Sequence, residues 1–410
     1  MASTPAPVSV ALAHHWLVGM RGGEKVLAAL AAMFPGAPLY TLLARPERLD
    51  PVLKEQQICT SWLQRFRFIP DVQRKALPFL ASAARSLDAT QHDVVICSDA
   101  AIIKAIRTRP GALKLCYCHS PIRYVWDLYD EYYAQAGRVG RLGLRWFAEG
   151  VRKADWAAAD SVTAFIANSH HVAERIRRCY GRASVVIHPP VQTDFPPQQE
   201  PPEDFYLVVG EHVGYKRNDL AIEACNRLGR PLVVIGAGPL LEPMRRLAGP
   251  TVKMLGWQSD EVVRDHLRRC RALLFCGQED FGLVPVEAQA AGRPVIAYGV
   301  GGALETVVDG LSGVFFSEQS VTSVTEAIER FELGTTLWGP QRIQQHARQF
   351  SVERFREQFQ QFYGEYLERY QTGGPEAVRA AIDQQRPMNP GRTDTPLKSP
   401  GGATDGSPVA

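Results

Sequence analysis

The stretch that decides the fold runs from residue 272 to residue 297 and reads ALLFCGQEDFGLVPVEAQAAGRPVIA. Its first four residues, Ala272–Phe275, are apolar and predict a buried strand. A loop with two acidic residues follows, and Pro285 can open a helix because proline is tolerated in a first helical turn. A second apolar run, Pro294–Ala297, predicts another strand. Strand, helix and strand in this order predict a βαβ unit with parallel strands.

The same alternation extends over most of the chain. Further apolar runs that predict strands are Val8–Ala13, Val94–Cys97, Lys114–Cys118, Val162–Ala167, Val185–Ile187, Tyr206–Val209, Leu232–Ile235 and Val252–Leu255. Stretches with helical apolar spacing, such as Glu24–Met33, lie between them. We therefore expect an α/β protein built on parallel sheets.

A proline-rich stretch divides this pattern into two halves. The prolines at 189–190, 196–197 and 201–202 cannot lie inside a helix or a central strand. We expect an N-terminal domain over residues 1–190 and a C-terminal domain over 191–350, with the ligand site in a cleft between them. Aromatic residues at helical spacing predict a packing helix over 351–371, and the polar composition of 372–410 predicts a disordered tail.

Composition excludes several classes of protein. Of the 410 residues, 45% are hydrophobic and 22% are charged, which is typical of globular chains, and a net charge of +3 gives no argument for a nucleic-acid partner. No apolar run approaches the roughly 20 residues that span a bilayer. The first residues also lack the features of a signal peptide, so we expect a cytoplasmic protein.

The eight cysteines are too sparse for a disulfide framework in a chain of this length. The closest pair, Cys116 and Cys118, is spaced by two residues on a predicted strand, so both thiols share one face. That spacing differs from the C-x-x-C of a zinc knuckle. We interpret both as packed core thiols.

Two glutamates flank the start of the helix predicted in the opening stretch. Glu279 lies in the loop and Glu287 in the first turns of the helix. A carboxylate can accept hydrogen bonds from sugar or ribose hydroxyls, and the amides of a helix start suit a phosphate. Acidic residues near a helix start also complement its dipole, so a purely structural role explains the spacing as well.

The pattern Glu279-x7-Glu287, with Phe-Gly and Pro-Val between, resembles the E-x7-E signature of retaining GT-B glycosyltransferases of family 4. Other segments fit the same family in order along the chain: Gly22–Val26, Tyr117–Pro121, Asn168-Ser169, Tyr215–Ala221, Val234–Pro239, Ala291–Ala297 and Gly301–Val307. The resemblance covers residues 8–370. It implies the GT-B architecture, in which two Rossmann-like parallel-sheet domains face a central cleft.

Within that family the chain is most similar to bacterial mannosyltransferases of O-antigen and exopolysaccharide assembly. The similarity rests on Cys118–Asp127, His188–Val191 and Tyr215–Ala221. The resemblance implies transfer of a hexose, mannose from GDP-mannose, to a saccharide or lipid-linked saccharide acceptor in surface polysaccharide synthesis. It implies neither a cofactor nor a metal, because GT-B relatives usually neutralise the diphosphate with protein cations.

The resemblance assigns the donor diphosphate to Lys216, whose ammonium would neutralise charge as the nucleotide leaves. Many relatives carry an arginine about five residues earlier, where this chain has Glu211. Either Arg217 or another cation compensates, or the diphosphate is held with less charge. Without the surrounding match, a solvated surface lysine would be the simpler interpretation of Lys216.

The resemblance assigns the sugar and the ribose of the donor to the two glutamates. Glu279 would accept hydrogen bonds from the sugar hydroxyls, helped by the backbone amides of Phe281, Gly282 and Leu283. Glu287 would accept from the ribose hydroxyls. Neither needs to be a general acid, because in a retaining transfer the leaving phosphate can take the acceptor's proton on the same face.

Three expected site residues belong to the first half of the chain. Gly22 and Gly23 follow the first predicted strand, where a backbone without Cβ can approach a phosphate closely. His119 follows another strand, and in the family a histidine here contacts the donor sugar. A structural role is the alternative for His119.

Aromatic and cationic residues alternate in Trp62–Ile69, and Arg74 and Lys75 follow. This mixture suits peripheral contact with an anionic inner membrane face, where a lipid-linked acceptor would lie. A helical hairpin with its aromatic residues in the core explains the segment equally well.

Two other functions are compatible with this architecture. A nucleotide-sugar epimerase would consume no acceptor and would release an altered sugar. A non-catalytic nucleotide-sugar-binding partner would tolerate Glu211 in place of the arginine. The combination of Lys216, Glu279 and Glu287 favours the transferase over both.

Overall fold

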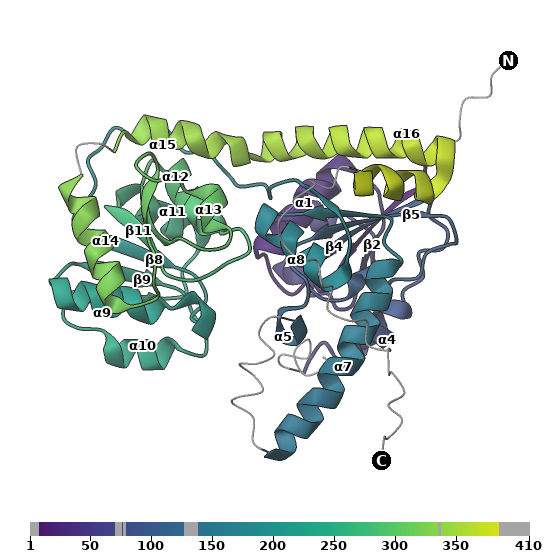
Figure 1. Cartoon of the computed structure of the whole chain (residues 1–410), viewed down its shortest axis with the longest axis horizontal. Coiled ribbons are helices and arrows are strands. Elements are labelled where there is room, and N and C mark those ends of the chain that lie inside the picture. The colour runs from purple at the N-terminus through teal and green to yellow at the C-terminus, as the bar shows by residue number, and fades with distance from the viewer. Residues whose placement is uncertain (1–7, 70–75, 77–78, 127–137, 335–337, 385–410) are drawn as a thin grey trace, which may run out of the picture. The chain divides into compact units, whose positions relative to one another are not determined.

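The computed structural model describes residues 8–69, 76, 79–126, 138–334 and 338–384. The chain divides into two compact units, each with its own sheet and core (Figure 1). The N-terminal unit comprises Met1–Asn168, Val172–Ile187 and Gln358–Ala410, and the C-terminal unit comprises Ser169–His171 and His188–Glu357. The chain passes from one unit to the other at the start of the proline-rich stretch.

The N-terminal unit is built on seven parallel strands in the order β3-β2-β1-β4-β5-β6-β7. They are β1 Val10–His14, β2 Leu39–Thr41, β3 Ile58–Thr60, β4 Val94–Asp99, β5 Leu113–Cys118, β6 Ala164–Ala167 and β7 Ser184–Val186. The strand order reverses between the neighbours β1 and β4. In open α/β sheets ligands bind at the carboxyl ends of the strands at such a switch point.

The helices of this unit connect successive parallel strands. They are α1 Gly22–Met33, α2 Pro51–Lys54, α4 Leu80–Arg85, α5 Arg123–Trp126, α7 Arg138–Asp160 and α8 His170–Tyr180, with 3₁₀ turns η1 Pro46–Arg48, η2 Trp62–Phe66 and η4 Ile103–Ala105. The apolar residues of α8 at helical spacing are buried, as their pattern predicts: Val172, Ile176 and Cys179.

The C-terminal unit repeats the arrangement with six parallel strands in the order β10-β9-β8-β11-β12-β13. They are β8 Tyr206–Val209, β9 Leu232–Ile235, β10 Val252–Gly256, β11 Ala272–Phe275, β12 Val295–Tyr298 and β13 Gly313–Phe316. Between them lie η5 Gly214–Lys216, α9 Asn218–Leu228, α10 Leu241–Leu247, α11 Asp260–Arg269, α12 Leu283–Ala290 and α13 Ala303–Thr306; α14 Val321–Leu333, α15 Pro340–Ala347 and η7 Arg348–Phe350 follow. Its switch point lies between β8 and β11.

The strands predicted from apolar runs are all present, within two residues at each end. Three further strands, β2, β3 and β13, were not predicted. Within the described residues, no helix combines the length and the apolar character that a bilayer crossing needs.

The core contains both thiols of the closely spaced pair. Cys116 and Cys118 lie on β5 and are buried in the main hydrophobic cluster of the N-terminal unit. Burial raises the pKa of each thiol. Their prediction as packed core thiols is confirmed, and all eight cysteines are free.

The C-terminal helix α16 runs from Val352 to Gln384, which corrects the boundary expected at residue 371. Gly374 has a φ of 70° and kinks the helix, and Pro375 restarts it. Beyond the kink Val378 and Ile382 are buried, so this segment packs rather than forming a disordered tail. Gly374 and Pro375 therefore interrupt α16 and do not end it. The remainder of the expected tail, residues 385–410, lies outside the described residues.

Candidate active site

The C-terminal unit brings two expected site residues into contact at its switch point. Lys216 ends η5, which follows β8, and Glu279 lies in the loop after β11. Because β8 and β11 are neighbours, the two loops meet, and Nζ of Lys216 lies 2.7 Å from Oε1 of Glu279. The side chains are 16% and 21% exposed, so the pair is accessible to a ligand.

The ammonium of Lys216 stays charged in this setting. Burial alone would lower its pKa, but the carboxylate of Glu279 outweighs burial and raises the pKa above its ordinary value. Tyr215 and Glu211 act in the same direction. The site therefore offers a cation held by an anion, an arrangement suited to a ligand that carries both phosphate and hydroxyl groups.

Gly277 allows the two loops to approach. A Cβ at this position would lie 2.6 Å from Cα of Lys216 and 2.9 Å from the carbonyl oxygen of Tyr215. Any side chain would displace the turn that carries the lysine. A backbone hydrogen bond from Gly302 to the carbonyl of Glu279, 2.9 Å long, holds the other side of the loop.

Arg217 is engaged elsewhere. It has a left-handed φ of 47°, and its guanidinium pairs with Asp219 at 3.0 Å. Compensation for Glu211 by Arg217, one of the alternatives that the sequence leaves open, would therefore require this ion pair to open. Glu211 is half-buried and close enough to raise the pKa of Lys216.

The remaining expected donor residues surround the start of α12. Gly282 precedes the helix with a φ of 86°, Leu283 is its first residue, and Phe281 is buried against His188 with ring centroids 5.4 Å apart. Glu287 lies in the second turn and is half-buried. The first amides of a helix have no partner within the helix, so this terminus suits an anionic or polar ligand group.

In the N-terminal unit, His119 is part of a chain of polar side chains at the carboxyl ends of β1, β4 and β5. Oγ of Ser98, on β4, lies 3.0 Å from Nδ1 of His14, on β1, and 2.8 Å from Nε2 of His119, which follows β5. The first turn of α1 packs against them. A Cβ on Gly23 would lie 3.3 Å from Cε1 of His14 and 3.6 Å from Nε2 of His119.

Gly22, Gly23 and His119 were predicted as site residues from the sequence, whereas His14 and Ser98 were not. The signal that could have found them is a polar residue at the end of a fully apolar strand. Such residues sit at the edge of a parallel sheet where ligands bind.

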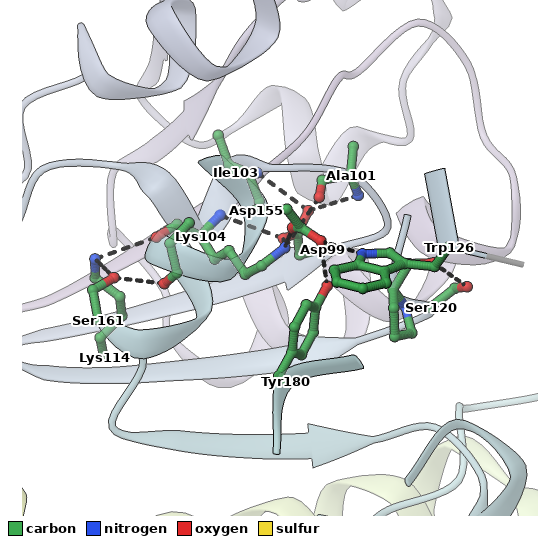
Figure 2. A network of polar contacts seen from close by, with 12 residues as sticks. Asp99, Ala101, Ile103, Lys104, Lys114, Ser120, Trp126, Asp155, Ser161 and Tyr180 are labelled. Atoms are coloured by element: carbon green, nitrogen blue, oxygen red, sulfur yellow. Dashed lines mark hydrogen bonds and ion pairs between the residues drawn. The ribbon is translucent and has the colours of Figure 1, made fainter. Parts of the chain in front are cut away.

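Asp99 follows Ser98 on β4, so its side chain points to the opposite face of the sheet. There it belongs to a buried ionic network (Figure 2). Nζ of Lys104 lies 3.0 Å from Oδ2 of Asp99 and 2.5 Å from Oδ1 of Asp155. Trp126 and Tyr180 donate hydrogen bonds to Oδ2 of Asp155 at 2.9 and 2.8 Å. This network holds the end of β4, the strand that carries Ser98.

Two protein-family models match the chain. Glycosyltransferase Family 4 matches residues 20–195, and Glycosyl transferases group 1 matches residues 190–350. Each model corresponds to one of the parallel sheets, and they meet in the proline-rich stretch. The chain has a GT-B glycosyltransferase architecture.

Curated relatives of this GT-B chain match over limited segments. The GDP-mannose-dependent alpha-(1-6)-phosphatidylinositol monomannoside mannosyltransferase of Mycolicibacterium smegmatis is 31% identical over 131 residues, which are 28% of this chain and 34% of that protein. O-antigen chain mannosyltransferase C of Escherichia coli is 27% identical over 165 residues, 38% of this chain and 43% of that protein. The chain thus spans less than half the length of these relatives.

The crystal structure of Anabaena HepE in complex with UDP-glucose shares the fold over nearly the whole GT-B chain. It has a TM-score of 0.65 and 16% sequence identity, and the match covers 87% of this chain and 99% of HepE. Among the described residues, no group of three or more His, Cys, Asp or Glu side chains is arranged to hold a metal ion.

Proposed function

We propose that the protein is a retaining glycosyltransferase that moves a hexose from a nucleotide diphosphate donor to a saccharide acceptor. The observation that carries the proposal is the ion pair of Lys216 and Glu279 at the switch point of β8 and β11. Both residues belong to segments that resemble the family's donor site, and both lie within residues 190–350, which the Glycosyl transferases group 1 model matches.

In this mechanism, arrival of the donor exchanges the partners of the pair. A diphosphate oxygen replaces the carboxylate as the acceptor for Lys216, and the ammonium then neutralises the charge that develops on the leaving nucleotide. Glu279 becomes an acceptor for hydroxyls of the donor sugar. The bond between the sugar's anomeric carbon and the diphosphate oxygen breaks, and the acceptor oxygen bonds to that carbon on the same face. The acceptor's proton passes to the leaving phosphate. Because the new bond forms on the face from which the phosphate leaves, the configuration at the sugar carbon is retained.

The donor we propose is GDP-mannose. The similarity to bacterial mannosyltransferases supports it, and both curated relatives described above carry mannosyltransferase names. The structural relative HepE was crystallised with UDP-glucose, so the nucleotide is the point to test first.

Thermal-shift titration with GDP, UDP, ADP and their sugar conjugates tests the donor, because a ligand that binds only the native state raises the melting temperature. Selective stabilisation by GDP and GDP-mannose is the expected result. Selectivity for UDP would exclude GDP-mannose as the donor but would remain compatible with transferase activity. No stabilisation by any nucleotide would contradict the transferase. Release of an altered free sugar without an acceptor would identify an epimerase.

We further propose that the N-terminal unit contacts an anionic membrane surface through the segment that follows β3. Leu63 is buried and Trp62 packs at the core edge, but Phe66 is 41% exposed and Phe68 is 77% exposed. The alternative of a purely core-forming hairpin explains only the first two. A pocket of about 500 Å³ beside them is lined by Thr60, Ser61, Trp62, Gln64, Arg65, Arg67 and Ser86. Arg74 and Lys75 lie outside the described residues.

Flotation with liposomes that contain an anionic lipid tests this contact. The variant Arg65→Ser, Arg67→Ser, Phe68→Ser should lose binding, because both the charge and the exposed aromatic ring are removed. Trp257 is 75% exposed on the C-terminal unit, so Trp257→Ser is the matched control and should float like the wild type. Equal flotation of the triple variant and the wild type would contradict the proposal.

A further inference from the structure

Two hydrogen bonds link His14, Ser98 and His119, and together they determine which ring nitrogen of each histidine carries a proton. His14 is fully buried. Burial, together with the neighbouring His15 and His119, lowers its pKa well below the ordinary value, although the backbone of Ser98 opposes this. His14 is therefore a neutral imidazole at physiological pH, with one N–H donor and one nitrogen lone pair.

The proton of His14 belongs on Nδ1. Its other nitrogen, Nε2, is buried and has no hydrogen-bond partner among the described residues. A buried N–H without an acceptor would bear the full cost of lost hydration, whereas a proton on Nδ1 is donated to Oγ of Ser98 at 3.0 Å. The unpartnered nitrogen is then the lone pair.

Through the hydroxyl of Ser98, the position of the proton on His14 determines the position of the proton on His119. A hydroxyl has a single hydrogen, and because Ser98 accepts from His14 it has that hydrogen to donate. The atom within reach is Nε2 of His119, at 2.8 Å. Nε2 must then be the lone pair of His119, and the proton of the neutral ring lies on Nδ1.

We propose that His14 and Ser98 are positioning residues that hold His119 as its Nδ1–H tautomer. This inference rests on the proposed transferase function and deepens it: His119 serves the donor sugar as a hydrogen-bond donor through Nδ1. It does not serve as a general base through Nε2, because that lone pair is occupied by Ser98. Gly23, in the first turn of α1, lies beside the rings of both His14 and His119. Because it has no side chain, the helix can approach both rings closely.

Selective ¹⁵N-histidine labelling of the full chain reads the tautomer directly, with His119→Gln assigning the signal. In the wild type, His119 should show a protonated Nδ1 and an unprotonated Nε2. In Ser98→Ala the Nε2–H form should gain population, because the hydrogen bond from Ser98 that requires a lone pair on Nε2 is removed. A wild-type signal for the Nε2–H form, or an unchanged signal in Ser98→Ala, would overturn the proposal.

Kinetics supply the second measurement. Ser98→Ala should lower kcat about tenfold, the factor that corresponds to one transition-state hydrogen bond, and change KM for the donor much less. His14→Leu should act like Ser98→Ala. His14→Asn should restore most of kcat, because its amide nitrogen occupies the place of Nδ1. Equal losses in the Leu and Asn variants would overturn the relay.

The two measurements separate the failure of this inference from the failure of the proposed function. The tautomer is read without donor, acceptor or turnover. Absence of transferase activity with the expected tautomer would count against the function, whereas activity with the wrong tautomer would count against the positioning role. If Ser98→Ala does not fold, the comparison of His14→Leu with His14→Asn still decides.

Discussion

Removal of the Lys104 side chain should strongly destabilise the N-terminal unit. Its side chain is 3% exposed and lies between Asp99 and Asp155, whose side chains are 2% and 0% exposed. Removing one partner from a buried ion pair costs about 3–5 kcal/mol, because the remaining charge is left without compensation. Backbone amides of Ala101 and Ile103 still donate to Asp99 at 2.8 and 3.2 Å. We therefore expect Lys104→Met to cost about 3 kcal/mol, the lower end of that range.

This loss should depend on pH. Burial by itself raises the pKa of Asp99, but Lys104 and His15 outweigh burial and lower it. In the wild type, the stability that Asp99 contributes is present above its unfolded pKa and is lost only as the pH falls through the lowered folded pKa. Without Lys104 the effect of burial dominates and the pKa of Asp99 rises. In mild acid Asp99 of the variant is then protonated, and the buried negative charge disappears. The loss of unfolding free energy in Lys104→Met should therefore be smaller at about pH 5 than at about pH 7.5.

Hydrogen exchange of the peptide that contains β4, measured over a urea series, gives the local unfolding free energy without assuming that both units unfold together. The matched control is Lys114→Met. Lys114 is buried, but among the described residues its ammonium donates hydrogen bonds only to neutral acceptors, the carbonyls of Lys104 and Ile106 and the hydroxyl of Ser161. Removing this ammonium leaves no buried carboxylate without a partner, so Lys114→Met should lower the free energy of unfolding by about 1 kcal/mol at both pH values. Equal deficits in the two variants, or a Lys104→Met deficit independent of pH, would refute the reasoning.

Three further variants test the donor site. Lys216→Met should reduce kcat by about 10²–10³, measured as nucleotide release with donor and acceptor, because it removes the cation proposed for the diphosphate. Arg217→Ala should change GDP affinity by less than about threefold in a thermal-shift titration, since its guanidinium is held by Asp219; a larger loss would mean that Arg217 turns to the donor. Gly277→Ala should weaken GDP binding by displacing the turn of Lys216, whereas Gly150→Ala, where a Cβ meets nothing within 4 Å, should not. Unchanged binding in Gly277→Ala would argue against a close fit of the two loops.

Much of the fold could be predicted because it depends on local patterns. Apolar runs such as Ala272–Phe275 and Leu232–Ile235 became strands at the predicted residues. The helical spacing of Val172 and Ile176 on α8 identified its buried face. The strands β2, β3 and β13 and the helical segment beyond Gly374 were not predicted, and each pairs or packs with segments distant in the sequence.

The sequence by itself determined the class of fold, the alternation of elements and the segments that carry the donor-site residues. Only the tertiary structure decided which of these residues meet. The 2.7 Å contact of Lys216 with Glu279 and the contact of Ser98 with His119 both depend on which strands are neighbours in the sheet. Periodicity is set by each segment's own residues, whereas strand order is set by packing between segments distant in the chain.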